Sequence, residues 1–264
     1  NLGDVSERLA EVLLGVDIVY SEDTRRTSKL LAHVGSEAPL RSLFAGNERS
    51  RSAEVVEKVR GGDRVALVSD AGVPNVSDPG SAAVRAILDA GLKVEVVPGP
   101  SAVTTALAAS GFTGDRFCFE GFLPKKGKDR MSRLQRLSVE DRPVVLFVAP
   151  HRLVEDLADL SRAVGDDREI AVAREMTKLH EEYWRGTLAD ALERWGPEEA
   201  RGEFTIVVGP GSGPDVSVAD GAEEARRLVG EGLSMSAAAR EVATSTGLPR
   251  REIYAALLGG QEGN

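Results

Sequence analysis

The feature that most constrains the fold is an alternation of short apolar runs with amphipathic patterns through the first 113 residues. Each apolar run has the length of a buried strand, and each amphipathic pattern repeats its apolar residues with the period of a helix. Strand and helix in regular alternation predict a parallel sheet that helices cover on both faces. The expected strands are 17–23, 63–70 and 92–99, and the expected helices are 5–16, 24–35, 51–62, 80–91 and 100–111.

The rest of the chain predicts a second α/β unit and a helical tail. Its expected strands are 116–122, 143–150, 168–176, 181–188 and 202–211, with helices at 151–165 and 188–195. A stretch rich in Gly, Pro and Ser follows, which is the composition of a linker. We therefore expect an N-terminal α/β domain over 1–113, a C-terminal α/β domain over 114–210, a linker over 211–220 and a small helical segment over 221–264.

The last two helical patterns, 234–247 and 248–260, allow two interpretations. Their spacing is that of a helix-turn-helix. The same spacing is common in packed helix pairs that never contact nucleic acid. We favour the second interpretation, a small helical cap packed on the main body.

Composition narrows the classes of function. The formal net charge is −9, so contact with nucleic acid or anionic lipid needs a local basic surface. The three His and the single Cys118 show no metal-ligand spacing. No apolar run approaches the ~20 residues of a membrane span, and no signal peptide opens the chain. A lone Cys cannot form an internal disulfide, which favours a reducing cytoplasm.

Two loops are expected at carboxyl ends of strands, where open α/β sheets bind ligands. They are VSDAGVPNVSDPG, residues 68–80, and VVPGPSA, residues 96–102. Neither contains Lys, Arg or a phosphate-loop pattern, which favours a ligand without phosphate that carries a positive charge. Gly99 allows a ligand close to the backbone, and Asp78 is expected to cap the following helix. The alternative is a pair of ordinary strand-to-helix turns.

Seven motifs occur in a fixed order: EDTRRTSKLL, LVSDAGVPNVSDPG, VPGPSAVTTALAASG, FCFEGFLPKKGK, PHRL, AREMTKLHEE and GEFTIVV. Together they resemble the tetrapyrrole-methylase superfamily, and within it the bacterial 2′-O-ribose methyltransferases of small-subunit ribosomal RNA. The resemblance runs from Asn1 to about Gly209, and the C-terminal helices fit it as well.

The resemblance implies two α/β domains of the tetrapyrrole-methylase type, with S-adenosylmethionine in the cleft between them. Methyl transfer from a sulfonium requires no metal, because the cofactor brings the electrophile. It also implies a homodimer and an activity on the assembled 30S subunit, methylation of the ribose 2′-hydroxyl of a cytidine in 16S ribosomal RNA. Asp70 is then expected to face the cofactor, the alternative being a local turn. The expected cofactor-binding residues are Asp70, Ala71, Gly72, Val76, Pro98, Gly99, Ser101, Ala102, Ala149, Met176 and Gly209.

The segment PKKGKDRMSRLQR, residues 124–136, is the strongest candidate for RNA contact. It carries six positive charges and one negative charge in an acidic chain, so it can contact phosphates from a mobile loop over the cleft. The alternative is a solvated helix face. The expected RNA-binding residues are Arg25, Arg26, Lys125, Lys126, Lys128, Arg130 and Arg133.

The group that accepts the hydroxyl proton is sought among Lys178, Glu175 and Glu48. A Lys whose pKa is lowered, or a carboxylate, can take this role. His180 titrates near neutral pH, but a packing role for it is equally open.

Three features depart from the family pattern. Relatives have a further strand that ends in a Pro-x-Gly loop, and we expect this strand to have been trimmed, since the chain starts at Asn1 without Met. A His-rich stretch is missing before Asn47, around Ala45 and Gly46, and Val148-Ala149 stands where relatives often have Glu-Ser. Two alternative functions stay open: methylation of a corrin or porphyrin precursor, and non-catalytic binding of a nucleoside or RNA on the same fold.

Overall fold

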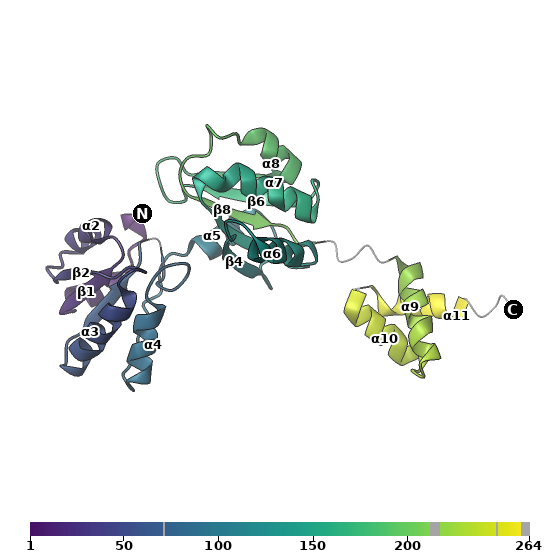
Figure 1. The fold of residues 1–264 in the computed structure, drawn as a ribbon, viewed down its shortest axis with the longest axis horizontal. Helices are drawn as coiled ribbons and strands as arrows, with labels where there is room; N and C mark the ends of the chain where they lie inside the picture. The colour runs from purple at the N-terminus through teal and green to yellow at the C-terminus, as the bar shows by residue number, and fades with distance from the viewer. Residues whose placement is uncertain (71, 212–216, 247, 260–264) are drawn as a thin grey trace.

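The computed structural model describes residues 1–70, 72–211, 217–246 and 248–259. Within these residues Figure 1 shows a small sheet near the N-terminus, a larger sheet in the middle of the chain and a group of helices at the C-terminal end. We refer to them as the N-terminal sheet, the central sheet and the C-terminal helices. The predicted α/β class is confirmed.

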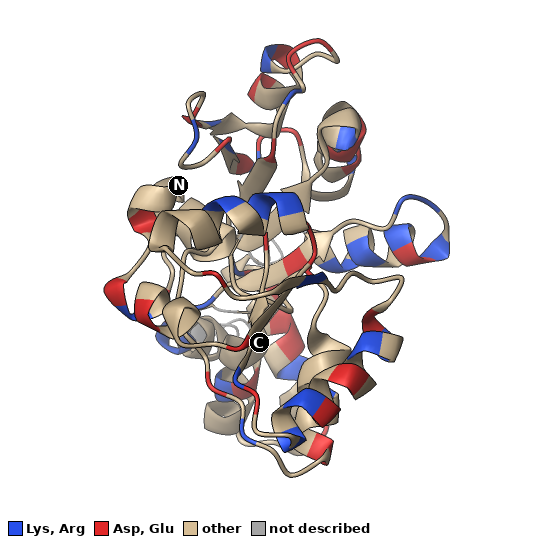
Figure 2. Cartoon of the chain, turned by 90° about the vertical axis from the view of Figure 1, so that its left-hand side faces the viewer, with Lys and Arg blue, Asp and Glu red and all other residues tan. Residues whose placement is uncertain are grey.

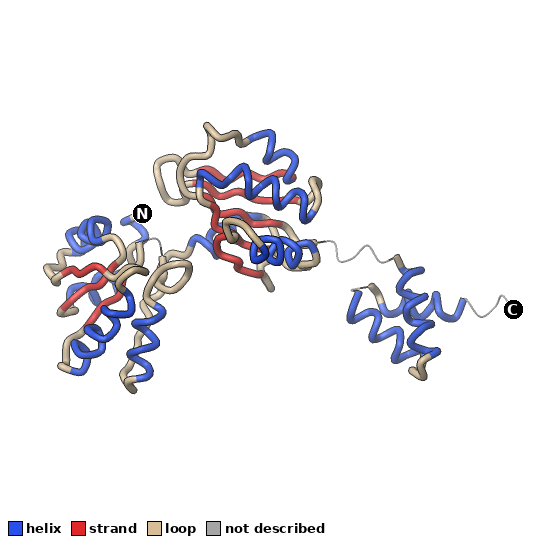
Figure 3. Tube along the Cα trace, viewed as in Figure 1, coloured by secondary structure: helices blue, strands red, loops and turns tan. Residues whose placement is uncertain are grey.

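The N-terminal sheet is parallel, as the alternation predicts. Its strands β1 (Ile18–Ser21), β2 (Leu40–Ser42) and β3 (Val65–Val68) lie in the order β2-β1-β3. Helices cover both of its faces (Figure 3). Alternate residues of each strand point to opposite sides, so apolar residues on both sides are buried under helices. Tyr20 contributes to the core under α3 (Glu48–Arg60) and α4 (Ser81–Asp89), and Val19 to the core under α1 (Glu7–Leu14) and α2 (Thr24–Val34).

The strand expected at 92–99 does not form, and this prediction was wrong. Val94 is 37% and Val96 63% exposed, and no described strand pairs with this segment. An apolar alternation becomes a strand only where a neighbouring strand satisfies its backbone groups. The sequence analysis also missed β2, because two of its three residues are polar.

The central sheet is mixed, in the order β4-β5-β8-β6-β7. Strands β4 (Cys118–Phe122) and β5 (Val144–Val148) are parallel. Strand β8 (Phe204–Val208) is antiparallel to both β5 and β6 (Glu169–Arg174), and β7 (Glu182–Thr187) is antiparallel to β6.

Helices also cover both faces of the central sheet (Figure 3). Helix α5 (Ala102–Ser110) packs on one face, where Val103 and Leu107 join Val145 and Val207. On the other face lie α6 (Lys128–Ser138), α7 (Leu153–Val164) and α8 (Leu188–Arg194). The short 3-10 helices span Leu2–Asp4 and Pro150–Arg152.

The C-terminal helices are α9 (Val218–Gly230), α10 (Met235–Thr246) and α11 (Arg250–Gly259). They enclose an apolar core of their own, which includes Ala225, Val242 and Ile253 and contains no residue of either sheet. Figure 1 shows the three helices apart from the sheets. The expectation of a cap packed on the main body was therefore wrong, because their apolar faces are buried against one another. No helix of the described residues is long and apolar enough to span a bilayer.

Candidate active site

A cavity of about 370 Å³ lies between the N-terminal sheet and the central sheet. This volume falls in the range of ~300–1,000 Å³ that is typical of small-molecule sites. Its lining residues come from the start of α2, the loop after β3, the start of α5, the ends of β4 and β5, and the start of β8. They are Arg26, Asp70, Gly72, Val73, Val76, Ser77, Asp78, Ser101, Ala102, Val103, Phe122, Phe147, Val148, Ala149, Pro150, Glu203, Phe204 and Thr205.

Strand direction explains which ends of the central sheet reach the cavity. Strand β5 runs toward it and ends at Val148, whereas β8 runs away from it, so that Phe204, its first residue, pairs with Val148. Gly209 follows the far end of β8; it is buried and its N–H donates to the Glu169 carbonyl at 2.8 Å. The structure therefore places Gly209 away from the cavity. Gly209 was expected at the cavity on the assumption that β8 runs in the same direction as β5, whereas the two strands are antiparallel.

Six of the expected cofactor-binding residues line the cavity: Asp70, Gly72, Val76, Ser101, Ala102 and Ala149. Ala71 lies outside the described residues. Pro98 and Gly99 are exposed and do not line the cavity. Met176 packs against the apolar cluster under α5 that also includes Phe147, so it supports the cavity wall from behind.

Gly72 brings the two predicted loops together. Its φ is +153°, and a Cβ at this position would lie 2.9 Å from the Pro100 carbonyl oxygen. Only glycine permits this close approach of backbone to backbone. Both loops were expected to line one cofactor cleft, and this contact joins them at the cavity.

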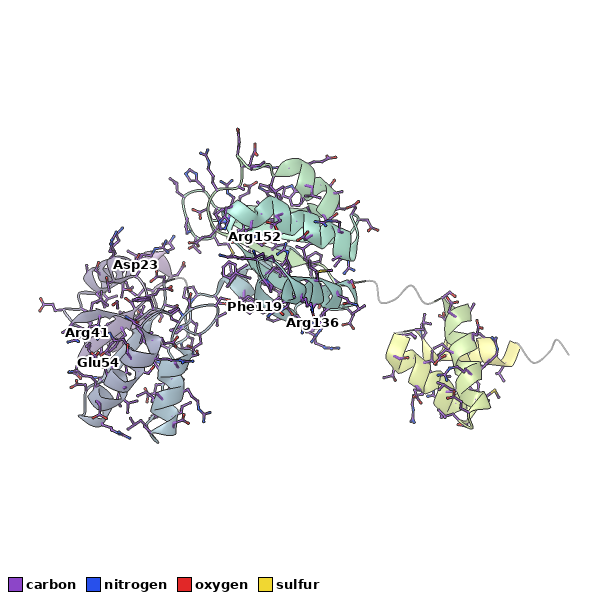
Figure 4. The ribbon with its side chains drawn as sticks, viewed as in Figure 1. Asp23, Arg41, Glu54, Phe119, Arg136 and Arg152 are labelled. Carbon is purple, nitrogen blue, oxygen red and sulfur yellow. The ribbon has the colours of Figure 1, made fainter. Side chains whose placement is uncertain are left out.

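Three carboxylates gather beside the cavity: Glu22, Asp70 and Asp78. Burial raises the pKa of Asp78, and the Asp70 carboxylate raises it further. Partial burial raises the pKa of Glu22, with repulsion from Asp78 and Asp70 adding to the effect. Asp70 accepts a hydrogen bond of 3.2 Å from the N–H of Asp23, the residue that caps α2 and is labelled in Figure 4. This negative surface favours a cationic ligand.

Asp78 does not cap α4, and this prediction was wrong. The N-cap residue is Gly80, and the carboxylate at this helix end belongs to Glu48. Glu48 accepts hydrogen bonds from the N–H of Gly80 at 2.9 Å and of Ala82 at 2.7 Å. Glu48, expected as a candidate base, is thus engaged at a helix N-terminus and does not line the cavity.

Lys178 and Glu175, the other candidate bases, form an ion-pair cluster with Glu203. The Lys178 ammonium lies 2.8 Å from Glu175 and 3.0 Å from Glu203. Burial alone lowers the pKa of Lys178, but the hydrogen bonds to Glu175 and Glu203 outweigh it and raise the pKa. The bond from Lys178 lowers the pKa of Glu175. Both groups are therefore charged at neutral pH, and of the three only Glu203 lines the cavity. His180 is exposed outside it.

Some of the expected RNA-binding residues are exposed without an ion-pair partner among the described residues, and others pair with carboxylates. Lys125, Lys126, Lys128 and Arg25 are exposed, and no described acidic group forms an ion pair with them. Arg133 pairs with Glu120 at 2.6 Å. Arg26 lines the cavity and lies 3.9 Å from Glu203 across the two sheets.

Arg130 is 5% exposed, and its guanidinium binds Asp156 at 2.7 Å and Asp159 at 2.6 Å. This burial leaves no face of Arg130 for a phosphate, so the structure gives it a packing role. Elsewhere Lys and Arg are interleaved with Asp and Glu (blue and red in Figure 2), as the net charge leads one to expect.

Several residues that line the cavity were not predicted from the sequence. Phe122 and Phe147 belong to strands whose apolar pattern reads as core, and only the fold shows that they open onto the cavity. Phe204 and Thr205 were missed because the direction of β8 was not known. Glu203 stands next to them in the motif GEFTIVV, and its place in this motif was the one available signal.

The sequence, fold and site together define the class. Residues 1–192 match the model of the tetrapyrrole (corrin/porphyrin) methylases, and residues 215–261 match that of the RsmI C-terminal HTH domain. The chain belongs to the tetrapyrrole methylase family.

Curated relatives match over nearly the whole chain. The ribosomal RNA small subunit methyltransferase I of Synechocystis sp. is 43% identical over 96% of this chain and 92% of its own length. The protein of the same name from Mycobacterium tuberculosis is 41% identical over 97% of this chain and 90% of its own length.

Solved structures share the fold at lower identity. The cobalt precorrin-4 methyltransferase of cobalamin biosynthesis aligns with a TM-score of 0.61 at 18% identity, over 79% of this chain and 90% of its own. Diphthine synthase aligns with a TM-score of 0.61 at 17% identity, over 79% of this chain and 86% of its own. These two likenesses concern the fold alone.

Proposed function

We propose that this protein transfers a methyl group from S-adenosylmethionine to the ribose 2′-hydroxyl of a cytidine in small-subunit ribosomal RNA. The observation that carries the proposal is the full-length similarity to ribosomal RNA small subunit methyltransferases I, at 43% identity over 96% of the chain. The precorrin methyltransferase shares the fold at 18% identity, which favours RNA over a tetrapyrrole as the acceptor.

The cavity fits the proposed cofactor by its chemistry. Ala102 and Val103 offer a small, apolar wall to an adenosine, and the lining contains no phosphate loop. Asp70 and Asp78 offer negative charge to the sulfonium and amino groups. When bound, S-adenosylmethionine supplies the electrophilic methyl group. Gly72 and Ser101 also line the cavity, at the point where the loop after β3 approaches Pro100.

The chain's own task is to bring the ribose hydroxyl to the cavity and to orient it. Exposed Lys125, Lys126 and Lys128 provide phosphate contacts, which fix the register of the RNA. Arg26 and Glu203 lie at the cavity, on the two sides of the junction between the sheets. We assign Glu203 to orientation of the hydroxyl, in place of Lys178 and Glu175, because, of these three groups, only Glu203 lines the cavity. By resemblance the protein acts as a homodimer, and the lone Cys118 fits a reducing cytoplasm.

The test is methyl transfer to 30S subunits that lack the modification. Purified protein is incubated with radiolabelled S-adenosylmethionine and either 30S subunits or a precorrin, and the RNA is digested to nucleosides. The expected product is a labelled 2′-O-methylcytidine. Label in the tetrapyrrole alone would show that the acceptor is wrong. Binding of S-adenosylmethionine without any transfer would favour the non-catalytic alternative.

A further inference from the structure

Phe122 places an open aromatic ring at the cavity. Its side chain is 53% exposed and lines the cavity. One side of the ring rests on Phe147, with the ring centroids 5.6 Å apart and the planes at 57°. Phe147 in turn meets Phe119 edge-on at 5.0 Å, and Figure 4 labels Phe119 in the central part of the molecule. Phe147 thus supports one side of the Phe122 ring, and about half of Phe122 stays exposed.

A β-bulge puts Phe122 on this face of the sheet. Phe119 pairs with Val145, but the next pair joins Gly121 to Leu146, so that Glu120 is the extra residue. In a regular strand Phe119 and Phe122 point to opposite faces, because side chains alternate. The extra residue shifts the alternation by one position. Phe122 therefore pairs with Phe147, on the face that α5 and the cavity share.

Gly121 makes the bulge possible and connects it to the N-terminal sheet. Its φ is +62°, a conformation in which a side chain causes strain. A Cβ at Gly121 would also lie 3.2 Å from the hydroxyl of Ser77, in the loop after β3. The orientation of Phe122 is thus set where the two sheets meet.

The basic loop follows Phe122 directly and is anchored at its start. The Pro124 carbonyl accepts a hydrogen bond of 3.0 Å from Arg130, and the Lys125 carbonyl accepts one of 3.2 Å from Arg152. Asp156, 2% exposed, accepts from both guanidinium groups. Arg130 and Arg152 thus donate hydrogen bonds to the backbone of the loop. They hold the chain at Pro124 and Lys125, two and three residues after Phe122.

A half-exposed aromatic ring followed along the chain by exposed lysines is an arrangement that proteins use to bind unpaired nucleotides. The lysines attract the phosphates and the ring stacks on the base. An enzyme that modifies a nucleotide inside folded RNA must first take that nucleotide out of its stack. We propose that Phe122 is the stacking platform for the base of the nucleotide that is methylated; this inference rests on the proposed function. The ribose then enters the cavity while its base lies on the ring.

The test compares Phe122→Ala with Phe122→Tyr, which keeps the ring. For Phe122→Ala, kcat/KM for 30S subunits falls about 5- to 150-fold, the loss expected of one stacked base. Phe122→Tyr stays within about threefold of the wild type, because stacking needs only an aromatic face. The Kd for S-adenosylmethionine, measured by calorimetry without RNA, stays the same in both variants.

Phe44→Ala is the matched control, since Phe44 is 45% exposed and does not line the cavity. Its activity on 30S subunits is expected to equal that of the wild type. A wild-type kcat/KM in Phe122→Ala overturns the inference. A loss of affinity for S-adenosylmethionine in Phe122→Ala also overturns it, because the ring then belongs to the cofactor site. A wild-type protein that methylates no 30S RNA overturns the proposed function itself, which is a separate outcome.

Discussion

Asp78 is half-buried next to Asp70, and its charge costs the folded protein free energy. Because burial raises its pKa, the folded chain binds this proton more tightly than the unfolded chain. The resulting stability is present below the ordinary Asp pKa and is lost as the pH rises through the raised pKa. Proteins retain such a destabilising charge at sites where the charge binds a ligand.

Asp78→Asn is therefore expected to change stability and binding in opposite directions. The free energy of unfolding of the variant exceeds that of the wild type at neutral pH, and the difference vanishes below about pH 4. Affinity for S-adenosylmethionine falls about tenfold, since a charge-assisted contact is lost. Urea unfolding across the pH range and calorimetry measure the two effects. Unchanged affinity would exclude Asp78 from the cofactor site.

Glu48→Ala is expected to lower stability and leave catalysis intact. The substitution removes the acceptor for the N–H groups of Gly80 and Ala82 at the start of α4, a loss of about 1–2 kcal/mol. Denaturant unfolding measures the loss, and kcat on 30S subunits is compared below the unfolding transition. A kcat reduced a hundredfold in a folded variant would return Glu48 to the candidate bases.

At the scale of elements, the loop before α6 carries the RNA prediction. No acidic group of the described residues forms an ion pair with Lys125 or Lys126 of this loop, or with Lys128, the first residue of α6. Arg130 and Arg133, further along the helix, pair with carboxylates. We therefore predict that the lysines contact the RNA, while Arg130 holds the loop to the rest of the protein. The RNA-binding surface predicted over residues 124–136 stays a prediction, from which the burial of Arg130 removes that residue.

Replacing Lys125, Lys126 and Lys128 together by Gln is expected to weaken 30S binding and to lower its dependence on salt. Three lost phosphate contacts reduce the slope of log K against log salt by about 2 to 3. The matched control replaces Lys29, Arg85 and Lys93, which are also exposed, by Gln. A triple variant with the slope of the wild type would exclude the loop from the RNA interface.

At the scale of the whole molecule, the C-terminal helices enclose an apolar core that contains no residue of either sheet. A group with a separate core unfolds as a separate unit. The domain boundaries drawn from the sequence, at 113/114 and 210/211, stay predictions that unfolding can address.

Val242→Asp is expected to abolish one thermal transition and to spare the other. Val242 is 1% exposed in the core of the C-terminal helices, and a buried unpaired charge costs several kcal/mol. Calorimetry of the full chain then shows the loss of a small transition and an unchanged main one. Thr244→Asp, at an exposed position of the same helix, serves as the control. A lowered main transition in Val242→Asp would mean that the helices and sheets unfold together.

The sequence by itself determined the alternation of strand and helix, the two loops around Asp70 and Ser101, and the family motifs. These features are local, because periodicity, Gly and Pro act within a few residues. Tertiary structure decided the rest. Because β8 is antiparallel to β5, its first residue Phe204 lies at the cavity and Gly209 does not. Residues 92–99 form no strand, because no described strand pairs with them. The bulge at Glu120 places Phe122 on the face of the sheet that lines the cavity. Each of these depends on which strand lies beside which, and such pairing joins residues that are far apart in the chain.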